Sequence, residues 1–304
     1  MYRLLISSLT AGLILLSTAQ AETKEDRFAK VEIKTTKLTD NLYMLKGSGG
    51  NIGVSAGEDG IFMIDDQYAP LTDKILKALK EISDQPVRFI INTHWHFDHT
   101  GGNENLGKKD AVIVAHDNVY KRMSTEQFIT AFDRHYDPSP KVALPVISFN
   151  DKVTFHLNGL NIKARHYPHA HTDGDSVILF KKNNVVHMGD IFFNKTYPFV
   201  DSSSGGSIYG MIAAVADILS MVDEETKIVP GHGPLANKAD LQDYHDMLVQ
   251  VVALLEPLAK EGMSADEAMA FDPLKPLNEK WAQGWMKADP MIKNVYPAIL
   301  KHVK

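Results

Sequence analysis

The sequence predicts an α+β fold in which two β-sheets stack on each other and helices cover their outer faces. The first observation that predicts this fold is an arrangement of strands followed by helix that occurs twice in succession. The second observation is that the chain becomes helical from residue 239 onwards. The 304 residues, 44% of them hydrophobic and 23% charged, are ample for a full core.

The N-terminus has the pattern of a secretory signal peptide. Arg3 precedes an apolar run from Leu4 to Leu16, and small residues stand at Ala19 and Ala21. We therefore expect cleavage after Ala21, a periplasmic or secreted protein, and no stable membrane association after cleavage. The alternative, an uncleaved membrane anchor, is disfavoured because the run is short for a bilayer span. The chain has no cysteine, which excludes a lipoprotein anchor, disulfides and thiolate ligands.

The first half of the remaining chain predicts a meander and then alternating helix and strand. Residues 34–66 contain short strand-like runs separated by turn signals, typical of antiparallel strands. Residues 69–82 have apolar residues at helical spacing. Residues 86–93 and 110–116 predict buried strands, and residues 117–123 a short helix.

The second half repeats strands and helix after a break. Residues 125–145 have weak periodicity and three prolines, which indicates a long loop that covers a site. The next predicted strands are residues 145–150, 152–159, 160–168, 175–183 and 184–190. A helix over 205–222 and a strand over 227–233 follow.

The C-terminal part predicts helices over 241–263, over 264–270 with Ser264 as N-cap, and over 278–288. The predicted organisation is a signal peptide at 1–21, a domain at 22–240, and a helical extension at 241–304 packed on that domain. The two tryptophans of the last segment, Trp281 and Trp285, are expected to pack, with a substrate cleft or a dimer interface as alternatives.

A dense cluster of metal-capable side chains follows the strand at 86–93. The stretch INTHWHFDHTGGN places His94, His96, Asp98 and His99 within six positions. Side chains alternate in an extended segment, so we expect the first three to face one side and His99 to face another, toward a second metal ion. Imidazole and carboxylate ligands suit zinc, and also iron or manganese.

Three later stretches offer the missing ligands at strand ends. His171 stands in HTDGD, Asp190 in HMGD, and His232 between two glycines in PGHG. His169 competes with His171, but the HTDG sequence favours His171 and leaves His169 as a supporting or substrate-facing group. No metal role is expected for the other histidines, which are His116, His135, His156, His166, His187, His245 and His302.

Two carboxylates offer support for the ligands from a neighbouring strand end. Asp65 and Asp66 follow the run IFMI and are candidates to orient a ligand imidazole through a hydrogen bond. The alternative is that they form hydrogen bonds within a turn. For Asp66 the two roles are equally expected, and for Asp65 the turn role is less expected.

Taken in order, THWHFDHTGGN, HTDGD, HMGD and PGHG resemble the metallo-β-lactamase superfamily, from about Lys34 to Leu241. The resemblance implies a four-layer αββα sandwich with two metal ions at one edge of the two sheets, most simply Zn²⁺. It implies that the first ion is held by His94, His96 and His171. The second ion is then held by Asp98, His99 and His232, and Asp190 bridges the two ions.

Such a centre makes a hydroxide at neutral pH that attacks a carbonyl carbon, with Asp98 as the catalytic group that orients it. Two divalent ions, two carboxylates and one hydroxide leave a charge of about +1. We therefore expect a small-molecule substrate that carries a carboxylate. The net charge of −6 and the lack of a basic cluster make nucleic acid an unexpected partner.

The substrate ranking depends on departures from the β-lactamase pattern. The presence of both His99 and Asp190 resembles glyoxalase II-type thioesterases and acyl-homoserine-lactone lactonases, whereas export favours a periplasmic β-lactam. Lys195 is spaced wrongly to hold a β-lactam carboxylate. A β-lactam-like cyclic amide or ester ranks first, a lactone or thioester second, and a phosphodiester third.

Two further classes of protein are alternatives to the hydrolase. A single-iron, persulfide dioxygenase-like protein is disfavoured by the full two-metal set. The other alternative is a non-catalytic exported metal-binding or accessory protein, which has no need of an open water site between two ions. The oligomeric state and the native metal are not determined by the sequence.

Overall fold

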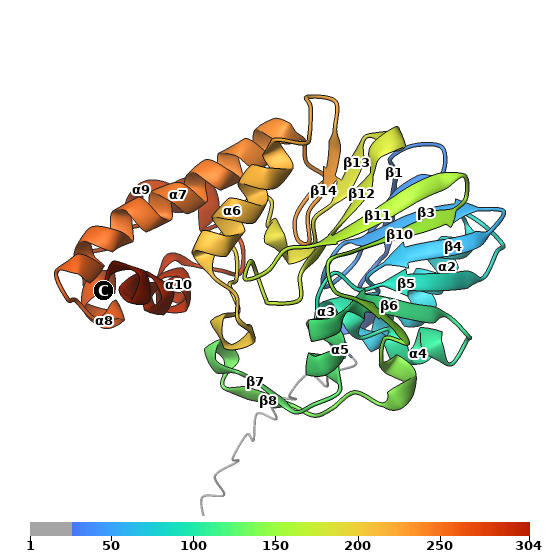
Figure 1. The fold of residues 1–304 in the computed structure, drawn as a ribbon, viewed down its shortest axis with the longest axis horizontal. Helices are drawn as coiled ribbons and strands as arrows, with labels where there is room; N and C mark the ends of the chain where they lie inside the picture. Colours follow the sequence, from blue (N-terminus) through green and yellow to red (C-terminus); the bar gives the residue numbers. More distant parts are fainter. Residues whose placement is uncertain (1–25) are drawn as a thin grey trace, which may run out of the picture.

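The computed structural model describes residues 26–304, so the predicted signal peptide and its cleavage point lie outside the described residues. The chain forms two sheets flanked by helices, followed by a helical C-terminal region (Figure 1). The predicted α+β, four-layer αββα fold is therefore confirmed. Within residues 26–304, no helix has the length and apolar character needed to cross a bilayer.

The first sheet has seven strands in the order β1-β2-β3-β4-β5-β6-β9. Their bounds are β1 Lys34–Lys37, β2 Leu42–Lys46, β3 Ile52–Gly57, β4 Gly60–Ile64, β5 Val87–Ile91, β6 Val112–His116 and β9 Ile147–Phe149. β1 to β4 pair antiparallel, which confirms the predicted meander, while β4, β5, β6 and β9 run parallel. Parallel pairing brings the C-terminal ends of these strands to one edge of the sheet.

The second sheet has five strands in the order β10-β11-β12-β13-β14. Their bounds are β10 Lys152–Leu157, β11 Leu160–His166, β12 Ser176–Phe180, β13 Val185–His187 and β14 Lys227–Val229. β10 to β13 are antiparallel, and β14 adds parallel to β13. The predicted strands of the second half are therefore present, although residues 145–150 belong to the first sheet.

The helices of the described residues lie between and after the strands. They are α1 Asp26–Ala29, α2 Thr72–Lys80, α3 Phe97–Thr100, α4 Asn103–Gly107, α5 Asp117–Met123, α6 Ile208–Leu219, α7 Lys238–Lys260, α8 Ala265–Ala270, α9 Lys275–Trp281 and α10 Ala288–Val303. The predicted helices at 69–82, 117–123 and 205–222 correspond to α2, α5 and α6. Ser264 caps α8 in a capping box with Glu267, as predicted.

Three hydrophobic clusters fill the three interfaces of the four layers. Along β4, Phe62 and Ile64 pack between the sheets, while Ile61 and Met63 pack toward α2. Along β12, alternate residues likewise belong to the inter-sheet core and to the core under α6 and α7. This alternation is the period of two that a strand buried on both faces requires.

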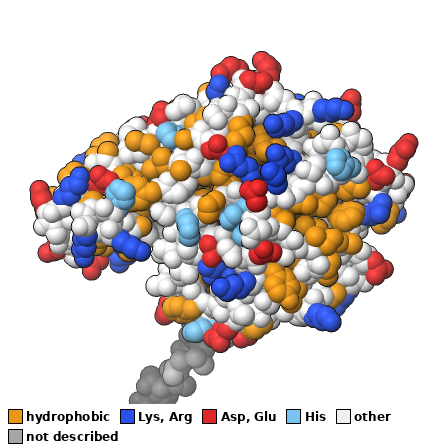
Figure 2. Space-filling view, viewed as in Figure 1, with side chains coloured by type: hydrophobic (Ala, Val, Ile, Leu, Met, Phe, Trp, Pro, Cys, Tyr) orange, Lys and Arg blue, Asp and Glu red, His pale blue; other side chains and the backbone are white. Residues whose placement is uncertain are grey.

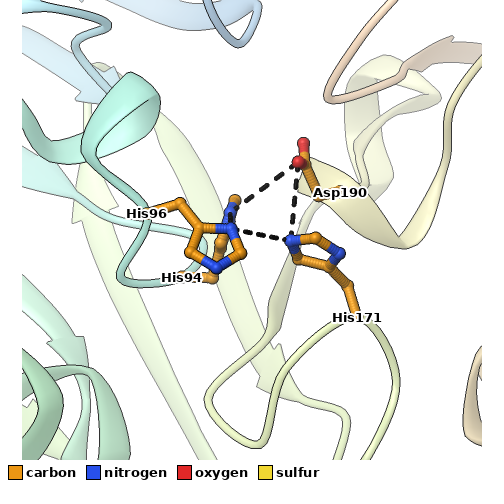
Figure 3. Close-up of side chains that lie close together, drawn as sticks. All are labelled: His94, His96, His171 and Asp190. Atoms are coloured by element: carbon orange, nitrogen blue, oxygen red, sulfur yellow. Dashed lines mark hydrogen bonds and ion pairs between the residues drawn. The ribbon is translucent and has the colours of Figure 1, made fainter. Parts of the chain in front are cut away.

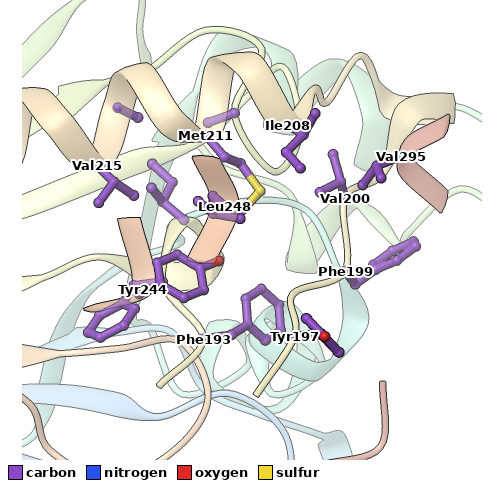
Figure 4. Close-up of a cluster of buried hydrophobic side chains, with 14 of the residues drawn as sticks. Phe193, Tyr197, Phe199, Val200, Ile208, Met211, Val215, Tyr244, Leu248 and Val295 are labelled. Carbon is purple, nitrogen blue, oxygen red and sulfur yellow. The ribbon is translucent and has the colours of Figure 1, made fainter. Parts of the chain in front are cut away.

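The C-terminal helices share the core beneath α6. Tyr244 and Leu248 of α7 and Val295 of α10 lie with Met211 of α6 in one buried cluster (Figure 4). The long amphipathic helix α7 thus shares its buried face with α6 and α10. The domain boundary at residue 240 stays a prediction. In the structure, residue 240 lies inside the first turn of α7, which begins at Lys238.

Two local predictions were wrong. The helix predicted over 278–288 ends at Trp281, and a further helix, α10, follows after a break that contains Gly284. Residues 125–145, predicted as a loop, contain the hairpin of β7 (Gln127–Ile129) and β8 (Arg134–Tyr136). Its three-residue strands are too short to show a period of two.

Asn294 of α10 attaches the C-terminal helices to the segment before α6. Its side chain accepts a hydrogen bond from Val200 N (2.7 Å) and donates one to Val200 O (2.6 Å), and all these groups are buried. We expect Asn294→Ala to lower the free energy of unfolding by about 1–3 kcal/mol, because a buried N–H and C=O lose their partners. Thermal and urea unfolding measure this. The exposed neighbour Lys293→Ala is the control, and equal stabilities would contradict the expectation.

Candidate metal centre

The predicted ligands come together at the ends of four strands. His94 and His96 follow β5, and His171 follows β11. Asp190 follows β13, and His232 follows β14. Two groups result: one of His94, His96, His171 and Asp190, and one of Asp98, His99 and His232.

The first group is buried and closely spaced (Figure 3). His96 Nδ1 lies 3.1 Å from His94 Nε2 and 2.9 Å from His171 Nε2. Asp190 Oδ2 lies 3.8 Å from His94 Nε2 and 3.6 Å from His171 Nε2. Three imidazole nitrogens and one carboxylate oxygen therefore face a common point.

The second group adjoins the first through Asp190. His232 Nε2 lies 3.3 Å from Asp98 Oδ2 and 3.4 Å from His99 Nε2. Asp190 Oδ1 lies 3.1 Å from His99 Nε2, and Asp190 Oδ2 lies 3.3 Å from His232 Nε2. The carboxylate of Asp190 is thus in contact with histidines of both groups.

The expected alternation of His94, His96 and Asp98 onto one side is wrong at Asp98. The backbone is extended at His96 but turns helical in α3, which begins at Phe97. Because the helical turn rotates the next side chains, Asp98 and His99 belong together with His232 in the second group.

Two carboxylates behind the ligands have different roles. Asp65 Oδ2 lies 2.8 Å from His99 Nδ1, and the same carboxylate accepts hydrogen bonds from Thr93 N and Oγ1. Asp66 instead accepts a hydrogen bond from Gly102 N at the start of α4. Asp65 therefore contacts an imidazole of the second group, as the hypothesis requires, whereas Asp66 bonds to the turn before α4.

Asp201 is a supporting residue that the sequence interpretation missed. Its Oδ2 lies 2.9 Å from His96 Nε2, and its other oxygen accepts hydrogen bonds from Ser203 Oγ and Ser204 N. Burial alone would raise the pKa of Asp201, but these hydrogen bonds and His96 hold it well below the ordinary value. The signal in the sequence is an aspartate before three serines, which indicates a turn and gives no link to His96.

The structure separates His171 from its competitor. His171 Nδ1 lies 2.8 Å from Phe199 O, which directs Nε2 toward His96. His169 is exposed, its Nδ1 lies 3.0 Å from Gly205 O, and it is outside both groups. Within the described part of the chain, the seven histidines for which no metal role was expected also lie outside both groups.

The N–H protons of the three imidazoles in the first group point away from its centre, which leaves room for a cation there. Thr93 Oγ1 donates to Asp65, so it accepts the proton of His94 Nδ1, 3.0 Å away. The protons of His171 and His96 are directed in the same way toward Phe199 O and Asp201. In the neutral rings, three imidazole lone pairs then face one another with no proton between them, which is the arrangement that a divalent ion requires.

The electrostatics of the two groups differ. Burial lowers the pKa of His171 to about 4 and that of His94 well below its ordinary value, so both rings stay neutral. Burial alone would also lower the pKa of His99, but Asp190, Asp98 and Asp65 raise it well above the ordinary value. Asp190 Oδ1 is buried and makes no hydrogen bond. The carboxylates thus present negative charge that a second cation would balance.

A pocket of about 320 Å³ opens onto both groups. Its lining contains Asp98, Asp190 and His232 and a set of aromatic side chains, which are Tyr68, Phe97, Phe132, Phe193, Phe199 and Trp285. Phe132 belongs to the segment 125–145, which was expected to cover a site, and this residue of the segment lines the pocket. Trp281 packs in the core as expected, whereas Trp285 is half exposed and lines the pocket.

No lysine or arginine is among the described residues that line this pocket. Lys195, which the sequence interpretation considered for a substrate carboxylate, forms an ion pair with Asp240 at the start of α7. The pocket therefore presents a metal-ligand face and an aromatic wall.

Asp65→Asn tests the support of His99. Without the carboxylate that fixes its Nδ1 proton, we expect the affinity for one of two metal ions to fall by about 10- to 100-fold. Titration with Zn²⁺ against a chromophoric chelator measures both affinities. The matched control is Asp66→Asn: Asp66 is the adjacent buried aspartate, it accepts a hydrogen bond from Gly102 N, and it lies outside both groups. Equal losses in both variants would contradict a specific role of Asp65.

The fold and the two groups of ligands define a metal-dependent hydrolase. A family model described as "Metallo-beta-lactamase superfamily" matches residues 45–236, which is more than half of the chain. The chain therefore belongs to the metallo-β-lactamase superfamily.

Curated relatives are similar to this chain at low identity. The hydroxyacylglutathione hydrolase of Pelagibacter ubique is 23% identical over 190 residues, which are 60% of this chain and 70% of that protein. The probable metallo-hydrolase YqgX of Bacillus subtilis is 24% identical over 198 residues, which are 62% of this chain and 90% of that protein. Both matches cover most of the relative's length.

Solved structures share the fold. A metallo-β-lactamase from Pontibacter korlensis has a TM-score of 0.59 and 18% identity, with coverage of 72% of this chain and 99% of that chain. The sec-alkylsulfatase Pisa1 from Pseudomonas sp. has a TM-score of 0.65 and 14% identity, with coverage of 89% of this chain and 50% of that chain. The chain thus spans about half the length of the alkylsulfatase.

Proposed function

We propose that this chain is an exported dinuclear-metal hydrolase that acts on the carbonyl of a small ester, preferably a cyclic ester or a thioester. The seven side chains of the two groups are the proposed ligands, with Zn²⁺ as the simplest metal. The observation that carries the proposal is the position of Asp190, whose two oxygens contact histidines of both groups. Export rests on the sequence pattern of residues 1–21 alone.

Two divalent ions held by these seven side chains would lower the pKa of a water molecule and polarise a carbonyl group. The side chains of the protein supply the orientation. Asp98 lies at the pocket surface; burial alone would raise its pKa, but His99 and His232 lower it to about 2. Asp98 is therefore ionised at neutral pH and can accept a hydrogen bond from an attacking water molecule. The aromatic wall excludes bulk water from the carbonyl.

The pocket lining changes the substrate ranking made from the sequence. A β-lactam carries a carboxylate beside the bond that is cleaved, and the described lining offers no lysine or arginine for it. A lactone or thioester with an uncharged acyl group needs no such partner. The similarity to a protein named hydroxyacylglutathione hydrolase is in keeping with this order. A β-lactam remains the second candidate, because the charge of the two ions still favours a nearby carboxylate.

Three substrates separate the candidates. The zinc-loaded protein is assayed with an acyl lactone, a thioester and a chromogenic cephalosporin, each with and without a chelator. Chelator-sensitive turnover of the lactone or thioester, at least about tenfold above that of the cephalosporin in kcat/KM, is the expected result. Preferred turnover of the cephalosporin would establish the β-lactam instead. Two bound metal ions without turnover of any ester, thioester or amide would favour a metal-binding or accessory protein.

The proposed substrate is a small molecule rather than nucleic acid. On the face of the molecule in Figure 2, lysine and arginine side chains are interspersed with aspartate and glutamate. The exclusion of nucleic acid stays a prediction. A titration of the protein with single-stranded RNA at low salt, where any phosphate binding is strongest, tests it.

A further inference from the structure

A second cavity of about 480 Å³ adjoins the pocket over the metal centre. The two spaces share the side chains of Phe132, Phe199 and Trp285. The rest of the second cavity is lined by residues 130–131 at the tip of the β7–β8 hairpin, by Ser202, and by residues of the range 286–297. Segments far apart in the sequence thus enclose one space beside the site.

The lining of this second cavity is mainly apolar. Met286, Pro290 and Pro297 contribute carbon surface. Lys293 is the one charged residue among the described residues that line it, and its side chain is 62% exposed. The side-chain amide of Asn294 is already bonded to the backbone of Val200. Binding of an apolar group in such a cavity is therefore more favourable in free energy than binding of a polar group.

Three aromatic rings connect the cavity to the metal centre. The Phe132 ring lies 4.9 Å from that of Phe199 and 6.3 Å from that of Trp285, measured between centroids. Phe199 is buried, and its ring lies 5.9 Å from His96 and 5.7 Å from His171. Phe132 and Trp285 are 44% and 55% exposed, which leaves large apolar surfaces available to a ligand.

We propose that the second cavity binds the linear alkyl part of the acyl group whose carbonyl reacts at the metal centre. This inference rests on the proposed function and adds the substrate class: an ester, lactone or thioester with an alkyl chain of medium length. The shared aromatic rings give the alkyl chain continuous apolar contact from the carbonyl into the cavity. Trp285, Phe132 and Ala131 are then residues that determine chain-length specificity.

Binding of primary alcohols tests the cavity without any reaction. 1-Hexanol, 1-octanol and 1-decanol are titrated into metal-free and zinc-loaded protein, and tryptophan fluorescence is recorded. Trp95 and Trp281 are 5% and 4% exposed, so the response is expected from Trp285, and Trp285→Phe should remove it. The Kd should fall about two- to fourfold for each added methylene; fourfold corresponds to about 0.8 kcal/mol. A Kd independent of chain length would overturn the inference.

Ala131→Phe fills the cavity from the exposed side of the hairpin. We expect it to weaken binding of 1-decanol by at least about tenfold and to have little effect on 1-hexanol. Ala270→Phe, the same change at an exposed position of α8 outside the cavity, is the matched control. Circular dichroism of each variant reports folding. If Ala131→Phe does not fold, the alcohol titrations of the unmodified protein still test whether the second cavity binds alkyl chains.

Hydrolysis of p-nitrophenyl esters from butyrate to decanoate separates this inference from the proposed function. A kcat/KM that rises with chain length in the unmodified protein, but not in Ala131→Phe, supports both. The opposite result is chelator-sensitive hydrolysis with the same kcat/KM for every acyl-chain length, in the unmodified protein and in Ala131→Phe. It overturns the alkyl-binding site but is still consistent with the proposed hydrolase. Chain-length-dependent alcohol binding without hydrolysis of any ester or thioester rejects the hydrolase and overturns the acyl-group assignment.

Discussion

Asp98→Asn should lower kcat by about 10³-fold or more, in a protein that still folds and still binds a metal ion at the first group. Asp98 contributes no atom to the group of His94, His96 and His171, so that group keeps its donors. The change removes a carboxylate that is ionised at neutral pH and that lies at the pocket surface beside His232. An amide of the same size cannot accept a proton or orient water through two acceptor oxygens.

The measurement combines kcat on the best substrate with metal content after gel filtration. Asp84→Asn is the control, because Asp84 is an exposed aspartate outside both groups. Near-normal kcat in Asp98→Asn would show that Asp98 does not orient the nucleophile. Loss of all bound metal would show that Asp98 is needed to assemble the centre rather than only to act in it.

The layers of the fold could be predicted because most of the longer strands and helices carry a local sequence signal, either an apolar run bounded by turn residues or a helical spacing of apolar residues. Residues 34–66 and 69–82 show periods typical of strand and helix, and the structure forms the expected elements there. The hairpin β7–β8 could not be predicted, since strands of three residues give too few positions to establish a period. The break after Trp281 was missed because Gly284 was read as part of a continuous helix.

The grouping of ligands was predictable only in part. His94 and His96 lie two residues apart in extended chain, and local geometry brings them together. For Asp98, the alternation of an extended chain gave the wrong side, because the helical turn begins at Phe97, whereas the family resemblance placed it with His99 and His232, where the structure has it. The pairing of His96 with Asp201 depends on the packing of a segment more than one hundred residues away, which α10 holds in place through Asn294.

The exposure of Trp285 illustrates the same limit. Sequence alone cannot separate a core tryptophan from one that lines a cleft, because both are apolar and both stand near helices. Trp281 points into the core under α7, whereas Trp285, four residues later and beyond the end of α9, lies beside Phe132 of the hairpin. The two tryptophans differ in exposure because α9 ends at Trp281. The cleft that Trp285 lines forms only when the hairpin packs beside it in the tertiary structure.

His171→Asn should remove one metal ion from the protein and abolish turnover, whereas His169→Asn should leave both metal ions bound. His171 Nε2 lies 2.9 Å from His96 Nδ1 in the buried first group, so its loss leaves two imidazoles there. We expect the affinity of that group to fall by roughly 10²-fold or more, beyond the 10- to 100-fold typical of residues that only support a ligand.

Asparagine is the matched replacement at both positions for a conformational reason. His169 has a left-handed backbone with φ of 56°, which asparagine tolerates better than alanine. Metal content per chain by mass spectrometry and kcat are measured for both variants. Loss of metal from His169→Asn with retention in His171→Asn would make His169 the ligand. Loss from both would show that the loop between β11 and β12 folds around the metal ion as a unit, since the exposed His169 has no direct contact with the centre.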